Sequence, residues 1–274
     1  MKSVKPYFSS VSAAVRAVVV LSVAMFVIGC ASVVPKEGLV AYYEFNNDAK
    51  DSSGLGNNGR FSQTEMVADR NGNEKSACRF NGKSSMVQVS PHDTLDEVRD
   101  AVTIAAWIKP ASWDPWFYMP IVCKGSSTRF YGLMLMGKGN SWLKGKDSST
   151  CFELCRLKPG VNVFVRAYSD AKIEIGEWQH VAISYENGIV RAYLNGELVG
   201  KAEAGGPLLS GKSPLYIGCD PEGGLEFFNG DMDDLRIYNR RLTSKEVEGL
   251  YDGELNWFSN SVRAMKWCFC PPAE

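Results

Sequence analysis

The segment that most constrains the fold is WQHVAISYENGIVRAYLNGELVG, residues 178–200. Two Asn-Gly pairs, Asn187-Gly188 and Asn195-Gly196, separate runs of β-branched and aromatic residues. Asn-Gly is the strongest short-range hairpin signal, because both central residues of a type I′ turn adopt positive φ. The segment therefore predicts a three-stranded antiparallel meander.

Other segments from residue 38 onward have the same short-strand character. Apolar residues alternate with others in AVTIAAWIKP (101–110) and VNVFVRA (161–167), and GLVAYYEF (38–45) is rich in aromatic and β-branched residues. A period of two places alternate side chains on one face of a strand. Roughly ten to twelve such strands without βαβ alternation predict an all-β sandwich or jelly roll.

One helix is expected, in LTSKEVEGLY (242–251). Thr243 is placed to cap the first turn while Glu246 reaches back toward it, which is the pattern of a capping box. Val247 and Leu250 then share one apolar face. We expect a short peripheral helix packed on the edge of the sandwich.

The N-terminus has the pattern of a targeting segment. Basic residues precede the apolar run AVVVLSVAMFVI (17–28), which is too short to span a bilayer as a mature helix. The run closes with VIGC, which resembles the lipobox of bacterial lipoproteins and implies cleavage before Cys30 and lipidation of its thiol. An ordinary signal peptide or a signal anchor is the alternative. We expect residues 1–29 to be a signal peptide and residues 30–37 a tether. The exported chain is then lipid-anchored to the bacterial cell envelope, at the outer membrane or cell surface.

Cysteine usage fits an exported protein. The chain has eight cysteines, and seven remain when Cys30 is set aside for lipidation. An odd number leaves at least one thiol free or paired between chains. CFELC (151–155) and CFC (268–270) lack the two-residue spacing of a zinc knuckle. We expect disulfide bonds or lone buried thiols, with the connectivity open.

Charge and motif content exclude several classes of function. The formal net charge is -1 and no basic block is present, which argues against a nucleic-acid partner. A retaining glycosidase needs two carboxylates close together, but the spacing of Glu174 and Glu177 places them on opposite faces of a strand. No Gly-x-Ser-x-Gly elbow occurs, and a base would have to be His92 or His180. The expectation is a non-catalytic chain, with a glycoside hydrolase as a distant third possibility.

Seven ordered blocks carry a family resemblance. They are GLVAYYEFNNDAKDSSGLGNNG, RFNGKSSMVQV, AVTIAAWIKP, IVCKG, GEWQHVAISYENGIVRAYLNGELV, PLYIG and FFNGDMDDLRIYNRRLTSKEVEGLY. In this order they resemble laminin-G-like domains, and more narrowly the bacterial concanavalin A-like jelly rolls. The resemblance spans residues 38–252. It implies an all-β antiparallel sandwich with one short C-terminal helix. The aromatic tail, 253–274, is expected to cover a sheet edge or to bind a partner.

The resemblance also bears on the acidic stretch GDMDDLRIYN (230–239). Many relatives hold a structural calcium ion where a D-x-S-G loop meets the last strand. On this sequence the ligands implied are Asp51 in DSSG, Asp233 and, more weakly, Asn57. Calcium takes six to eight oxygen ligands, which Gly-rich turns and carboxylates can supply. The alternative is a set of solvated turn residues, with Asp234 meeting a nearby arginine.

The most suggestive ligand-binding segment is SWDPWFYMP (112–120), in which aromatic residues cluster between two strand signals. Sugars stack their apolar faces on exposed aromatic rings, whereas buried rings would only fill the core. The residues expected to contact a ligand are Trp113, Asp114, Trp116, Tyr118 and Trp142. The sequence thus favours a surface-anchored carbohydrate-binding module with a structural calcium ion, whose partner is a glycan or polysaccharide. A protein-interaction, adhesion or envelope-structural module with an extracellular protein partner is the alternative.

Overall fold

The computed structural model describes residues 34–112, 118–125, 130–137, 150–158, 161–203, 206–221 and 226–253. For residues 150–151, 155–158 and 161–164 it describes the backbone alone.

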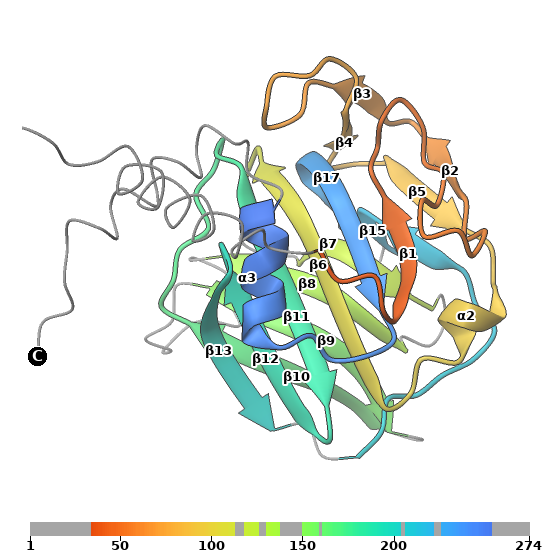
Figure 1. Ribbon diagram of the computed structural model, residues 1–274, viewed down its shortest axis with the longest axis vertical. Helices are drawn as coiled ribbons and strands as arrows, with labels where there is room; N and C mark the ends of the chain where they lie inside the picture. Colours follow the sequence, from red (N-terminus) through yellow and green to blue (C-terminus); the bar gives the residue numbers. More distant parts are fainter. Residues whose placement is uncertain are drawn as a thin grey trace, which may run out of the picture.

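Two large antiparallel sheets form the fold (Figure 1). Sheet A has the order β13-β12-β11-β6-β17-β4-β3, with β1 also paired to β17. Its strands are β1 (Leu39–Tyr43), β3 (Glu65–Val67), β4 (Ala77–Asn81), β6 (Ala101–Pro110), β11 (Gln179–Glu186), β12 (Ile189–Leu194), β13 (Glu197–Glu203) and β17 (Asn229–Tyr238).

Sheet B has the order β10-β9-β8-β7-β14-β5-β2, and β15 and β16 form a separate two-stranded hairpin. The strands of sheet B are β2 (Gly59–Ser62), β5 (Met86–Val89), β7 (Met119–Lys124), β8 (Tyr131–Gly137), β9 (Thr150–Lys158), β10 (Val161–Ser169) and β14 (Leu215–Ile217). The hairpin comprises β15 (Cys219–Asp220) and β16 (Glu226–Phe227).

The meander predicted from the two Asn-Gly pairs is confirmed. β11 pairs with β12 and β12 with β13, both antiparallel. Asn187 and Asn195 each have a φ of 51°, and the following glycines, Gly188 and Gly196, are also positive. The two turns therefore have the backbone that the sequence pattern requires.

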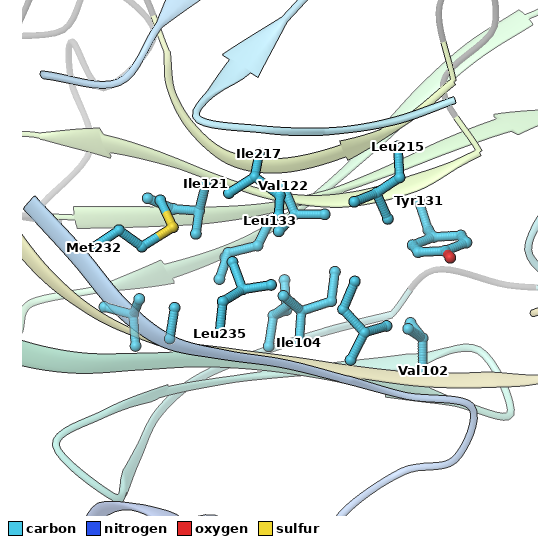
Figure 2. Packing of buried hydrophobic residues seen from close by; sticks show 14 of the residues in the cluster. Val102, Ile104, Ile121, Val122, Tyr131, Leu133, Leu215, Ile217, Met232 and Leu235 are labelled. Atoms are coloured by element: carbon cyan, nitrogen blue, oxygen red, sulfur yellow. The ribbon is translucent and has the colours of Figure 1, made fainter. Parts of the chain in front are cut away.

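The core lies between the two sheets and is built by strict alternation of side chains. Leu133 on β8 points into it, as do Val102 and Ile104 on β6 (Figure 2). Leu135 on β8 belongs to the same core cluster. Met134 on β8 points to the opposite face of sheet B. Each sheet therefore has an inner face toward the core and an outer face, and the outer faces carry most of the polar chemistry.

The predicted helix is α3 (Ser244–Gly253), which lies on the outer face of sheet A (Figure 1). Its capping box is formed, because the Glu246 amide donates to Thr243 Oγ1 at 3.2 Å and the Thr243 amide donates to Glu246 Oε2 at 2.8 Å. Val247 and Leu250 are buried against Tyr193 of β12. The helix therefore covers a sheet face rather than the sandwich edge.

A short helix that the sequence did not predict, α2 (Asp93–Asp96), is capped by His92, whose Nδ1 accepts from the Thr94 amide. Within the described ranges, no helix is both long and apolar enough to span a bilayer. The described residues form strands β1 to β17, which is more than the roughly ten to twelve strands predicted from the sequence.

Three of the cysteines are buried free thiols: Cys78, Cys123 and Cys219. For these three, the lone-thiol alternative is confirmed and a disulfide bond is not formed. The thiols of the remaining five, Cys30, Cys151, Cys155, Cys268 and Cys270, lie outside what the structure describes.

Candidate functional site

The acidic stretch of β17 is bent by a β-bulge. Strand register against β6 shifts between Asp233 and Arg236, and Asp234 has a φ of 48°. Met232 and Leu235 on either side point into the core. The bulge therefore turns both Asp233 and Asp234 toward the outer face of sheet A, although neighbouring residues of a regular strand would face opposite sides.

An arginine from a distant loop engages both carboxylates. Arg70 Nη1 contacts Asp233 Oδ2 at 2.5 Å and Nη2 contacts Asp234 Oδ2 at 2.7 Å. The other Asp234 oxygen accepts from the Tyr42 hydroxyl at 2.5 Å and pairs with Arg236 at 3.4 Å. Burial, and then the neighbouring Asp234 carboxylate, raises the pKa of Asp233, while Arg70 acts to lower it. The predicted contact of Asp234 with a nearby arginine is confirmed, but the pair is buried rather than solvated.

The third acid of the stretch has a separate partner. Asp231 accepts two hydrogen bonds from Arg79, at 2.7 Å from Nε and 3.0 Å from Nη2. The Arg79 side chain is 50% exposed, whereas the Asp231 side chain is 9% exposed, so only the arginine side of this bidentate pair reaches the surface.

Asp51, the second predicted calcium ligand, closes its own loop. Its Oδ1 accepts from the backbone amides of Tyr42 at 3.0 Å and Ser53 at 2.9 Å. Its Oδ2 accepts from the Ser53 hydroxyl at 2.8 Å and the Asn57 amide at 2.9 Å. Four donors match the roughly four acceptor positions of a carboxylate.

Asn57, the third predicted ligand, is buried. Its Nδ2 donates to the Val40 carbonyl at 2.7 Å and to Thr94 Oγ1 at 2.9 Å, and its carbonyl accepts from the Tyr43 hydroxyl. Its side-chain oxygen is buried without a hydrogen-bond partner.

Most polar atoms of these three residues are engaged within the chain. Asp51 is satisfied by loop donors and Asp233 by Arg70, so only the Asn57 side-chain oxygen is open to an ion. Within the described ranges, no group of three or more His, Cys, Asp or Glu side chains gathers as a metal centre would. A calcium ion held by Asp51, Asp233 and Asn57 stays a prediction from the family resemblance.

The outer face of sheet B carries a second polar arrangement, which crosses β8, β9 and β10. Met134 pairs across strands with Glu153, and Glu153 pairs with Arg166. Arg166 Nε donates to Glu153 Oε2 at 2.7 Å. Its Nη2 donates to the Tyr118 hydroxyl at 2.8 Å. We call Tyr118, Glu153 and Arg166 the sheet B polar cluster.

Within this cluster, exposure differs sharply from one residue to the next. Glu153 is fully buried, whereas Tyr118 and Arg166 are partly exposed, as is Tyr168 on β10 beside them. Burial, and then Glu153, raises the pKa of Tyr118 to about 12, so its hydroxyl stays protonated and able to donate. Burial lowers the pKa of Arg166, but Glu153 more than offsets this and the net shift is upward.

The β15–β16 hairpin adds further acids to the same side of the fold. Asp220 pairs across strands with Glu226, and both are buried. Cys123 on β7 has its sulfur 3.7 Å from Asp220 Oδ1. Burial, and then these two carboxylates, raises the pKa of the Cys219 thiol to about 12. The cluster and hairpin together offer donors and acceptors of the kind that bind hydroxyl groups.

Of the ligand-binding residues predicted from the sequence, the structure describes Tyr118. Trp113, Asp114, Trp116 and Trp142 lie outside the described residues, as does Cys30. Tyr118 packs against Met134 and Met136, so it lies on the outer face of sheet B rather than in the main core.

Three residues of these polar arrangements were not predicted from the sequence: Arg70, Glu153 and Arg166. One signal was available for Arg166, because the alternation in VNVFVRA places it opposite the inward-pointing valines. Glu153 lies in CFELC, a segment whose sequence signal comes from its two cysteines. Nothing in the local sequence links Arg70 to residues 233 and 234.

The comparisons with known proteins agree with this architecture. The family model of the concanavalin A-like lectin/glucanases superfamily, Laminin_G_3, matches residues 81–248. This chain belongs to that superfamily. The resemblance drawn from the sequence blocks is thereby confirmed.

Two solved structures share this fold. Domain 4 of AbnA, a GH43 extracellular arabinanase from Geobacillus stearothermophilus, was solved in complex with arabinotriose. It is 23% identical at a TM-score of 0.60, and the match covers 78% of this chain and 98% of that one. The binding domain of botulinum neurotoxin DC in complex with rat synaptotagmin II is 13% identical at a TM-score of 0.57, covering 79% and 52%. At these identities the likeness shows the fold alone.

A curated relative is the adhesion G-protein coupled receptor V1 of Danio rerio. It is 27% identical over 157 residues, which are 55% of this chain and 2% of the receptor. The chain thus spans a very small part of that relative. Of the two solved structures, one is named as a binding domain and the other was solved with a bound trisaccharide.

Proposed function

We propose that this chain is a non-catalytic carbohydrate-binding module whose ligand contacts the outer face of sheet B around Tyr118 and Arg166. The observation that carries the proposal is the 2.8 Å contact between the Tyr118 hydroxyl and the Arg166 guanidinium, at a partly exposed position. An aromatic ring held beside fixed polar groups is the arrangement that sugars require, with apolar stacking and directed hydrogen bonds.

Three further observations support the proposal. Trp113 and Trp116 lie just before Tyr118 in the sequence, so the chain concentrates aromatic residues at this end of β7. The arabinanase domain that shares the fold was solved with arabinotriose. Arg166 is already oriented by buried Glu153, which lowers the entropy cost of presenting its donors to a ligand.

The setting of this function rests on the sequence. We propose an exported chain held at the bacterial cell envelope by a lipid on Cys30, which brings the module to extracellular polysaccharide. A calcium ion near Asn57 stays part of the proposal only as a structural support, since it does not lie in the sheet B polar cluster.

A protein-binding module is the second candidate. A neurotoxin binding domain of the same fold was solved with rat synaptotagmin II, so the fold also supports protein recognition. In that case the partner is an envelope or extracellular protein. Glycoside hydrolysis ranks third, because Glu153 is fully buried and paired with Arg166.

A glycan array decides between the first two candidates. We expect the purified chain to bind a subset of oligosaccharides, and Arg166→Met to reduce affinity at least tenfold, a loss typical of charged hydrogen bonds. Arg241→Met is the matched control, because Arg241 also pairs with a glutamate, Glu186 at 2.9 Å, but on sheet A.

Trp113→Ala and Trp116→Ala test whether the aromatic segment joins the site. Binding that survives both tryptophan variants but is lost with Arg166→Met restricts the site to the sheet B polar cluster. A folded chain that binds nothing on an array containing arabinan and ganglioside glycans would reject the carbohydrate proposal and favour a protein partner.

A further inference from the structure

Adjacent buried carboxylates need positive charge nearby. The Asp233 and Asp234 side chains are 4% and 15% exposed and face the same side of sheet A. Two like charges at this separation repel strongly when water is excluded. Something on the outer face of sheet A must therefore neutralise them.

Two guanidinium groups provide that charge within the chain itself. Arg70 contacts both carboxylates and Arg236 contacts Asp234, so two positive charges match two negative ones. The side chains of Arg70 and Arg236 are themselves nearly buried. A doubly charged cation added to this balanced group would leave an excess of buried positive charge.

Arg70 lies in a loop that is held by hydrogen bonds of its own. Asp69 Oδ1 accepts from the amides of Asn71 and Asn73, both at 2.8 Å, and the Asp69 amide donates to the Asn73 carbonyl at 3.0 Å. Gly72 supplies the positive φ that the turn requires. The loop therefore holds its shape before the arginine reaches β17.

The Trp107 ring also contacts the Arg70 guanidinium. The Arg70 guanidinium lies 4.7 Å from the centre of the Trp107 ring, a cation–π distance. Trp107 in turn stacks on Tyr251 of α3 at 5.4 Å. The arginine thus joins the loop, sheet A and the covering helix.

We propose that Arg70 takes the place of a metal ion at the Asp233–Asp234 pair. A guanidinium presents planar paired donors that match two carboxylate oxygens, whereas calcium would require six to eight oxygens in the same space. Each Asp233 oxygen already accepts a hydrogen bond, one from Arg70 and the other from the Asp234 amide at 2.8 Å. The tie between an early loop and the last strand is therefore part of the covalent chain and does not depend on calcium.

Thermal unfolding of the full chain tests this inference. We expect Arg70→Met to lower the melting temperature by roughly 10 °C, because it strands two buried carboxylates. Arg241→Met is the matched control, since it breaks a similarly short pair, with Glu186 at 2.9 Å, whose side chains are 28% and 40% exposed, and its expected shift is below about 3 °C. Arg70→Met combined with Asp233→Asn should recover most of the loss, because Asp234 keeps its pair with Arg236.

Calcium dependence is measured with a second variant, so the test survives if Arg70→Met fails to fold. The change in melting temperature between excess calcium and EDTA is expected to be the same in Asp233→Asn as in the native chain. A stabilisation by calcium that is present in the native chain and absent in Asp233→Asn would overturn the proposal. So would an Arg70→Met variant that melts at the same temperature as the Arg241→Met control.

Discussion

The outer faces of the two sheets use the same residue types for different ends. On sheet A, Arg70 and its carboxylates are packed against Trp107, which stacks on Tyr251 of α3. On sheet B, Arg166 holds Glu153 with similar geometry, yet its side chain is 19% exposed against 8% for Arg70. An ion pair that is sealed ties the fold together, whereas one that reaches solvent remains available to a ligand. Burial, rather than the arginine–carboxylate pair itself, therefore separates the two roles.

After Arg70, the packing of α3 on the outer face of sheet A should contribute most to the stability of that face. Leu250→Ala removes a fully buried side chain from the α3 interface, and we expect a loss of about 3 kcal/mol in the free energy of unfolding. Leu198→Ala is the control, because that leucine is 50% exposed and its loss should cost below about 0.5 kcal/mol. Urea denaturation measures both. Equal losses would show that α3 does not seal sheet A.

Acidification should weaken the sheet A face through His180, which lies fully buried beside Trp107. Burial, and then Arg236 and Arg70, lowers the pKa of His180 to about 3. Below the unfolded value of about 6.5, the unfolded chain binds a proton that the native chain does not, so stability falls as pH falls. We expect this residue to contribute a loss of about 2 kcal/mol between pH 6.5 and pH 5.

The test compares unfolding at the two pH values in the native chain and in His180→Phe. The loss attributed to His180 should disappear in the variant, because phenylalanine does not titrate. A pH dependence unchanged by His180→Phe would contradict the assignment.

The smallest expected effect concerns the cap of α3. Thr243→Ala removes the oxygen that accepts from the Glu246 amide, and we expect a loss of about 1 kcal/mol. Thr243→Ser keeps that oxygen and should retain most of the stability. Denaturation curves for the two variants measure the difference. A serine variant as unstable as the alanine variant would show that the threonine methyl group, and not the cap, supports the helix cover.

A structural feature could be predicted from the sequence when the residues that form it lie close together along the chain. The meander and the α3 cap were predicted because turn residues and capping residues lie beside the elements they shape. The Arg70–Asp233 pair was not, because 163 residues separate the two side chains. The bulge at Asp234 was also missed, since no glycine marks it and aspartate adopts positive φ less often.

The sequence by itself determined the sandwich, its alternating strands, its capped helix and its family, because short-range patterns encode all of these. Only the tertiary structure decided what the charged residues do. Asp233 and Asp234 became a buried anchor because a bulge turned them to one side and a remote loop supplied Arg70. Tyr118 and Arg166 became the candidate site because antiparallel pairing placed them on one partly exposed face. Charge and hydrogen bonding act through space, so their outcome depends on which strands the fold brings together.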